Sequence, residues 1–357
     1  MAAAVAAAAT SPTLAFLSPP ATPFPVEAGS FSPHGYQVLP LLQSMMAKND
    51  LDGEHYGERE GGGGGRAREK KDEGGCKERR GKNTHSTFPP PTPHPAATAV
   101  AFFKNTPGHL LPLANTLLAR HAQGLKYPAL AAPADGADAL AAVAPLVARF
   151  GGTPRLMAAV EEGVRATQAS PAAAACAQAA AAVLERVALL GEGVAAAIRI
   201  SAGNPAVPGP GRAWLTAGLD AAKSGDPLLG VAEDGDDSAP AALVSAVAVA
   251  AAEGVGEAYE AGVLAGAARG GAAAVPRAHL VGAWLAARAA VLAQAEPASG
   301  VDPARPPGAP PAAWRAQAVK ALQLEAMTHV LLYQRGASVP IAMAGDDVGG
   351  AEVVAEV

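Results

Sequence analysis

The stretch SPAAAACAQAAAAVLERVALLG, residues 170–191, carries a helix signal at each end. Ser170 can accept a hydrogen bond from a free backbone N–H of the first turn, and Pro171 follows where its missing N–H costs nothing. Gly191 is typical of a helix stop. Alanine, which fills half of the interval 171–190, favours the helix more than any other residue. The stretch therefore predicts a helix over residues 171–190.

Helical spacing recurs through the chain. Apolar residues follow one another at intervals of three and four, mostly with Gly or Pro near the ends, over 137–150, 154–167, 241–252 and 257–268. No stretch shows convincing strand-like alternation. Half of the 357 residues are hydrophobic, but only seven Phe, five Tyr and three Trp are present, so packing must rely on closely approaching alanine-rich helices. These features predict an all-α protein.

The charge pattern argues against a nucleic-acid partner. The formal net charge is −5, whereas nucleic acid is bound by clustered Lys and Arg. The basic residues within 66–82 are interleaved with Glu and Asp, which favours a solvated segment. The acidic run formed by Glu233, Asp234, Asp236 and Asp237 is likewise expected to be a solvated loop.

Cysteine usage and hydropathy indicate a cytoplasmic protein. Cys76 and Cys176 lack the spacing of a disulfide framework or a zinc site, which favours a reducing compartment. The best apolar run, 241–252, is shorter than the roughly 18 residues of a membrane span, so no membrane partner is expected. Residues 1–10 contain no arginine and are interpreted as an alanine-rich extension, with organelle targeting as the alternative.

The composition changes sharply along the chain. Residues 57–95 combine five consecutive glycines, mixed charge and a proline cluster, and such a segment cannot bury enough apolar surface to offset its ordering entropy. We assign an alanine-rich extension to 1–13, the first part of the folded domain to 14–56, a disordered insertion to 57–95, the main helical body to 96–294, a proline-rich linker to 295–311, a C-terminal helix to 312–335 and a mobile tail to 336–357.

An ordered series of short elements resembles one known family. The elements are FLSPP at 16–20, GSFSPHGYQ at 29–37, YP at 127–128, PLVARF at 145–150, VEEGVRATQ at 160–168 and GVLAGA at 262–267. In this order they resemble the ADP-ribosylglycohydrolase family, and most closely its J-crystallin branch. The resemblance implies an orthogonally packed all-α bundle. In active relatives it also implies hydrolysis of an ADP-ribosyl bond with magnesium held by carboxylates.

The two elements that resemble the family's metal motifs have lost acidic positions. At 32–37, which reads SPHGYQ, Tyr36 stands where the crystallin branch has an aspartate. The later motif falls on 251–256, where Glu253 replaces one aspartate and the side chain of Val255 has no oxygen to bind a metal. Magnesium requires several oxygen ligands. We therefore expect a magnesium site that is at best half present, with Glu253 as its metal candidate, and that holds no ion.

Further candidates follow from the same resemblance. Glu253 and Asp135 are the catalytic candidates, and Ser32, Gln37 and Gln168 match positions expected to contact substrate. For Gln168 a helix-end hydrogen bond is an equally weighted alternative. Asp135 and Asp138 either face a ligand cleft or cap the helix that follows, since Asp at a helix start accepts from free N–H groups.

Three hypotheses about function remain open at this point. The first is an ADP-ribosylglycohydrolase-like protein that has lost efficient metal-dependent hydrolysis and still binds an ADP-ribose-type small molecule. The second is a working hydrolase in which Glu253, Asp135 and other carboxylates hold one magnesium ion. The third is a crystallin-like helical scaffold without a ligand. The oligomeric state is open in all three.

The insertion gives a direct prediction. Limited proteolysis of the full chain should cut within 57–95 first and leave the helical body intact, because an unordered backbone fits a protease cleft. The cleavage sites would be read by mass spectrometry. Early cuts inside the helical body with 57–95 intact would contradict the assignment.

Overall fold

The computed structural model describes residues 38–42, 44–45, 95–105, 110–224, 237–252 and 274–295. The predicted insertion 57–95, apart from its last residue, the expected helix 257–268 and all of the chain beyond 295 lie outside this part. The same holds for Ser32, Gln37 and Glu253.

The described residues form helices joined by turns, as predicted. Their bounds are α3 Pro95–Asn105, α4 Pro112–Ala122, the 3₁₀ helix η1 Ala137–Ala142, α5 Val143–Phe150, α6 Leu156–Arg165, α7 Pro171–Leu190, α8 Val194–Gly203, α9 Gly209–Lys223, α10 Ala239–Ala251 and α12 Ala274–Ala295. Residues 38–42 and 44–45 are also helical. Extended pairing within this part is limited to two isolated bridges, so the all-α prediction is confirmed.

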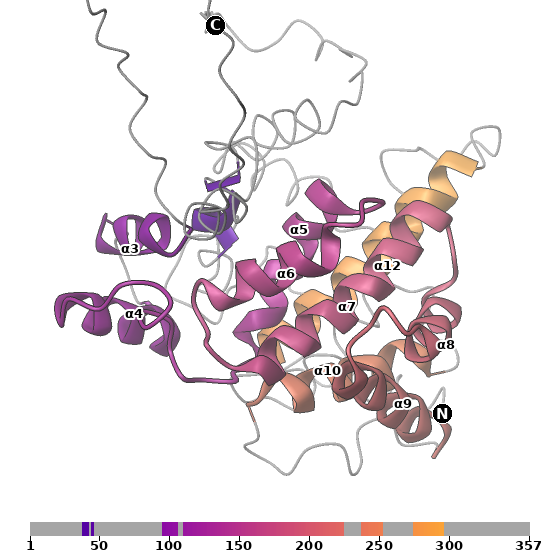
Figure 1. The fold of residues 1–357 in the computed structure, drawn as a ribbon. Helices are drawn as coiled ribbons and strands as arrows, with labels where there is room; N and C mark the ends of the chain where they lie inside the picture. The colour runs from indigo at the N-terminus through magenta and orange to yellow at the C-terminus, as the bar shows by residue number, and fades with distance from the viewer. Residues whose placement is uncertain are drawn as a thin grey trace, which may run out of the picture.

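Helix α7 forms the centre of the bundle (Figure 1). Its ends are those predicted: the Ser170 hydroxyl accepts from Ala173 N at 3.3 Å, and Gly191 takes a left-handed φ of 67°. Residues 173–184 are all buried. The helix packs against η1, α5, α6, α8, α9, α10 and α12. From α12, the buried Trp284 indole donates to Ala180 O at 3.3 Å.

The best candidate for a membrane span in the described part is α7, and not residues 241–252 as expected from the sequence. Among the described residues, Pro171–Leu190 is the one helix that is long and apolar enough to cross a membrane. However, 72% of its apolar window is buried inside the fold. A helix covered by other helices of the same chain is a core helix, because its apolar surface is already removed from water.

Several predicted helix limits differ from those observed. The predicted helix 137–150 is divided into η1 and α5, because Pro145 has no N–H to donate to the preceding turn. The predicted helix 154–167 narrows to Leu156–Arg165. Helix α10 begins two residues earlier than predicted, since the Ser238 hydroxyl accepts from Ala241 N at 3.3 Å and caps it. Helices α3, α4, α8, α9 and α12 were not delimited from sequence.

Helices α3 and α4 lie to one side of the bundle (Figure 1). They share a hydrophobic cluster that is separate from the main core. Its buried members are Ala96, Ala99, Val100, Phe103, Ala114, Leu117, Leu130 and Ala166. Only Leu130 and Ala166 in this set come from outside the two helices, so few of the described residues join the α3–α4 pair to the bundle through this cluster. We call this boundary the seam.

Glycines bring α9 into close contact with α7 and α10. A Cβ built on Gly211 would lie 2.9 Å from Ala175 O. A Cβ on Gly218 would lie 2.5 Å from Val247 Cγ1 and 2.8 Å from Val244 O. Real Cβ atoms do not approach backbone oxygens this closely, so any side chain at Gly218 must push the helices apart.

This contact predicts the effect of a single methyl group. Gly218→Ala should lower the free energy of unfolding by about 1–3 kcal/mol, because it overpacks the α9–α10 contact. Urea denaturation measures the change. The control is Gly203→Ala, where nothing lies within 4 Å of the added Cβ; there we expect no loss, and a gain of up to about 1 kcal/mol from helix propensity. Equal stability of the two variants would contradict the observed packing.

Candidate functional site

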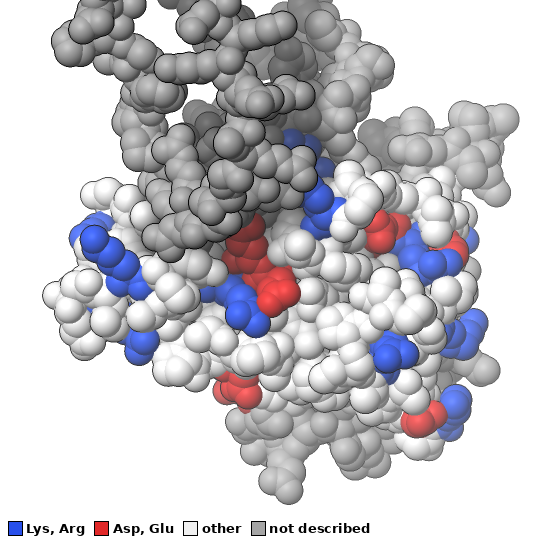
Figure 2. Space-filling view, viewed as in Figure 1, with Lys and Arg blue, Asp and Glu red and all other residues white. Residues whose placement is uncertain are grey.

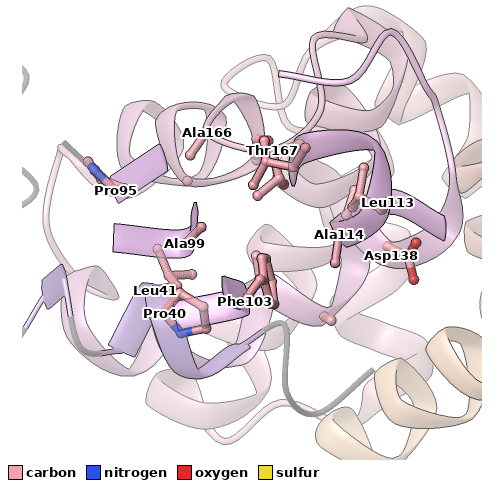
Figure 3. A pocket seen from close by; sticks show the side chains of 16 residues that line it. Pro40, Leu41, Pro95, Ala99, Phe103, Leu113, Ala114, Asp138, Ala166 and Thr167 are labelled. Atoms are coloured by element: carbon pink, nitrogen blue, oxygen red, sulfur yellow. The ribbon is translucent and has the colours of Figure 1, made fainter. Parts of the chain in front are cut away.

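Two cavities lie along the seam between the α3–α4 pair and the bundle. The smaller, of about 40 Å³, lies among residues 40–41, α3, α4, η1 and the end of α6 (Figure 3). Asp138 is the one charged side chain among the described residues that line it. The larger, which we call the seam cavity, has a volume of about 490 Å³. Its apolar walls are residues 111–113 and 132–134, and its polar side chains come from Thr116, Asp138, Gln168 and Asp237.

The wall of the seam cavity is a segment held between two helix starts. Near α7, Ala132 N donates to Thr167 O at 2.8 Å, and Ala169 N donates to Ala132 O at 2.7 Å. Near α10, Ala137 N donates to Asp237 O at 3.0 Å, and Ala239 N donates to Asp135 O at 2.6 Å. Residues 132–137 thus join the starts of α7, α10 and η1, which fixes the cavity wall to the core helices.

Gln168 holds the first turn of η1. Its side chain is 1% exposed, and the amide orientation that satisfies both ends donates to Gly136 O at 3.2 Å and accepts from Ala139 N at 3.1 Å. These contacts join Gln168 to the start of η1, about thirty residues earlier in the chain, and not to the end of the helix that precedes it. Gln168 also lines the seam cavity, and its contact with a substrate stays a prediction.

Asp135 and Asp138 do not have the helix-capping role that was considered for them from the sequence. The N-cap of η1 is Gly136, without a side-chain cap, so neither Asp135 nor Asp138 caps this helix. Asp135 is exposed, and its backbone carbonyl rather than its carboxylate makes the contact to α10. Asp138 is half-buried in the first turn of η1, where the helix dipole favours its charge, and lines both cavities.

Asp237 is a site residue that the sequence analysis missed. It was assigned to a solvated acidic run, and it is indeed exposed, but it lines the seam cavity one residue before the α10 cap Ser238. The signal was available in principle, because Ser238 followed by Ala239 and Pro240 is a helix start. A helix that starts at Ser238 places Asp237 directly beside the helical bundle.

The one described cysteine offers no nucleophile. Cys176 is fully buried in α7, and burial raises the pKa of its thiol, with a smaller contribution from the Asp135 carboxylate. The thiol form therefore persists at neutral pH, whereas the thiolate is the reactive form. Cys176 acts as a small packing residue.

Charges on the outer face are mixed in sign. Figure 2 shows basic and acidic side chains interspersed over the described part of this face, with no broad basic area among them. Several form pairs, such as Arg165 with Glu161 at 2.9 Å and Lys223 with Asp220 at 2.8 Å. Exposed pairs of this kind contribute little to stability.

Comparison with known proteins bears on the fold. No protein-family model and no curated protein matches the chain. A solved structure described as an "ADP-ribosylglycohydrolase-related protein complex" superposes with a TM-score of 0.51 at 18% identity, over 87% of this chain and 83% of that one. The chain has an ADP-ribosylglycohydrolase-like fold. This agrees with the family named from the sequence elements, while the crystallin branch stays a prediction.

The described part of this ADP-ribosylglycohydrolase-like bundle shows no cluster of metal ligands. Among the residues that the structure describes, no group of three His, Cys, Asp or Glu side chains could hold a metal. Magnesium in proteins is usually bound by one or two carboxylates together with several waters. Asp138 and Asp237 are the acidic side chains among the described residues that line the seam cavity. The absence of a bound magnesium ion stays a prediction.

The two ends of α10 lie far apart. Ala239, whose N–H donates to Asp135 O, begins α10, and Ala252 follows its other end. A helix of 13 residues is about 20 Å long at 1.5 Å per residue. Glu253 lies outside the described residues, so a metal site that it shares with Asp135 stays a prediction.

The Gln168 contacts predict a stability effect. Gln168→Ala should lower the free energy of unfolding by about 1–3 kcal/mol, because it removes a buried amide that bonds two backbone groups of η1. The control is Gln123→Ala at the exposed end of α4, where we expect a change within about 0.5 kcal/mol. Urea denaturation compares the two, and equal losses would contradict the assigned role.

Proposed function

We propose that this protein is an ADP-ribosylglycohydrolase-like protein that binds an ADP-ribose-type small molecule in the seam cavity, with magnesium-dependent hydrolysis weakened or lost. The observation that carries the proposal is the seam cavity itself, on a bundle with this fold. Its volume of about 490 Å³ lies within the roughly 300–1,000 Å³ of small-molecule sites.

The construction of the cavity also supports ligand binding. Small-molecule sites combine apolar walls with a few fixed polar groups. Here the apolar walls 111–113 and 132–134 meet Thr116, Asp138, Gln168 and Asp237. Backbone hydrogen bonds tie this wall to the starts of α7 and α10, so the polar groups are placed before a ligand arrives.

Weakened hydrolysis follows from the ligand set. Hydrolysis assisted by magnesium needs carboxylates that hold the ion and place the attacking water. The described part contains no such group of acidic side chains. In the sequence, Tyr36 and Val255 replace two acidic positions of the motifs that the elements resemble. Both observations favour binding without efficient hydrolysis.

Calorimetry with ADP-ribose and with magnesium chloride tests the proposal. We expect the full chain to bind ADP-ribose without added magnesium. Binding of ADP-ribose only when magnesium is present, together with release of free ADP-ribose from a modified substrate, would instead identify a working hydrolase. Binding of neither would leave a helical scaffold and refute the proposal.

A thermal measurement tests the metal separately. Magnesium chloride at millimolar concentration should leave the melting temperature of the parent protein and of Glu253→Ala unchanged and equal, because a bound ion stabilises the fold only in proportion to its occupancy. ADP-ribose should raise both melting temperatures alike. A rise caused by magnesium in the parent protein that disappears in Glu253→Ala would show an occupied site.

A further inference from the structure

The α3–α4 pair and the turn that follows it are held together as one unit. The two helices share the small hydrophobic cluster, to which Leu130 from beyond the turn also belongs. Arg120 of α4 reaches across the turn, and its Nε and Nη2 both donate to Ala129 O, at 3.1 and 2.6 Å. We call this set, the described residues 95–105 and 110–130, the α3–α4 unit.

On its C-terminal side the α3–α4 unit joins the bundle through a short link. The last backbone hydrogen bond back to the unit runs from Ala131 N to Pro128 O at 3.2 Å. The next residue is already fixed to the bundle, because Ala132 N donates to Thr167 O at 2.8 Å. Hinges between moving parts are a few residues at the ends of elements that absorb a change in φ and ψ. The peptide between Ala131 and Ala132 has the position of such a hinge.

The boundary between the α3–α4 unit and the bundle is incompletely filled. Both the smaller cavity and the seam cavity of about 490 Å³ lie along it. One side of the seam cavity is formed by residues 111–113 and Thr116 of the unit, and the other by the wall that is tied to the starts of α7 and α10. Atoms that face a void lack dispersion contacts on that side. Separation along this boundary therefore costs less than separation of the closely packed core helices.

Phe102 is the side chain that connects the α3–α4 unit with the main core. It is half-buried and packs against both the small cluster and the main core, whereas its neighbour Phe103 belongs to the small cluster. The two rings meet edge to face, with their centroids 5.7 Å apart. Leu110 and Leu118 are the other half-buried apolar residues around the small cluster, and their described packing is against that cluster. Phe102 thus spans the boundary.

We infer that the α3–α4 unit is a lid, which moves as one body about the link between Ala131 and Ala132 and so changes the width of the seam cavity, with Phe102 as the contact that holds it closed. The motion keeps the hydrogen bonds of Arg120 within the unit and those of Ala132 within the bundle, because they lie on opposite sides of the link. The inference concerns the protein without a ligand, so its outcome is independent of what the cavity binds.

Distances between spin labels in the full chain test the lid. One pair joins the exposed Ala119 of α4 to the exposed Arg199 of α8, and a reference pair joins the exposed Ala158 of α6 to Arg199, with each labelled site replaced by Cys in a Cys76→Ser background. Cys176 is buried and takes no label. We expect a broad distance distribution for the first pair and a narrow one for the reference pair, because only the first pair spans the link. Equal widths would overturn the inference.

Truncation of the spanning side chain gives a second test. Phe102→Ala should shift the distances of the first label pair to longer values and leave the reference pair unchanged, because it removes a contact between the α3–α4 unit and the main core. The control is Leu118→Ala, which truncates a side chain packed against the small cluster and should leave the distances unchanged.

Hydrogen exchange distinguishes a lid from local unfolding. In Phe102→Ala the amides of α3 and α4 should stay protected, because a body that moves as a whole keeps its internal hydrogen bonds. Unchanged label distances in this variant, or loss of protection in both helices, would overturn the inference. The comparison of the two label pairs in the presence of Phe102 does not depend on how the variant folds.

Discussion

The structure depends on the close burial of one alanine-rich helix. Helix α7 is buried continuously over residues 173–184 and touches seven neighbouring elements. Side chains as small as alanine contribute little area each, so stability must come from many helix surfaces in short-range contact. The same constraint explains the glycines of α9, which face α7 and α10 at distances that exclude a Cβ. The largest fully buried side chain, that of Trp284, packs within the same core.

The candidate site is a consequence of this packing. Because α7 and α10 are both held in the core, the residues just before them, Gln168 and Asp237, are brought to one place. The segment that starts at Ala132 bonds to both helix starts and carries Asp138 between them. The α3–α4 pair has its own small cluster and covers this wall without filling the seam. The cavity is therefore rigid on one side and thinly packed on the other.

The similarity of the fold to an ADP-ribosylglycohydrolase-related structure does not by itself show which residues would carry out a reaction. The bundle superposes on an ADP-ribosylglycohydrolase-related structure at low sequence identity, which establishes the fold alone. The described residues contain no group of three metal-ligating side chains. A polar cavity can persist after metal ligands are lost, because groups such as Gln168 stabilise the fold as well as line the cavity. This dual role keeps the cavity intact whether or not hydrolysis is retained.

The sequence by itself determined the local features, because these depend on neighbouring residues only. Ser170 and Gly191 delimit α7, alanine content excludes a sheet protein, and the order of the short elements indicates the fold family. Only the tertiary structure decided which ends of the helices meet. Gln168, Asp138 and Asp237 are separated by up to 99 positions and share one cavity, while Ala252 lies at the other end of α10 from Asp237. The direction in which each helix crosses the core sets these distances, and that direction depends on packing against residues far away in the chain.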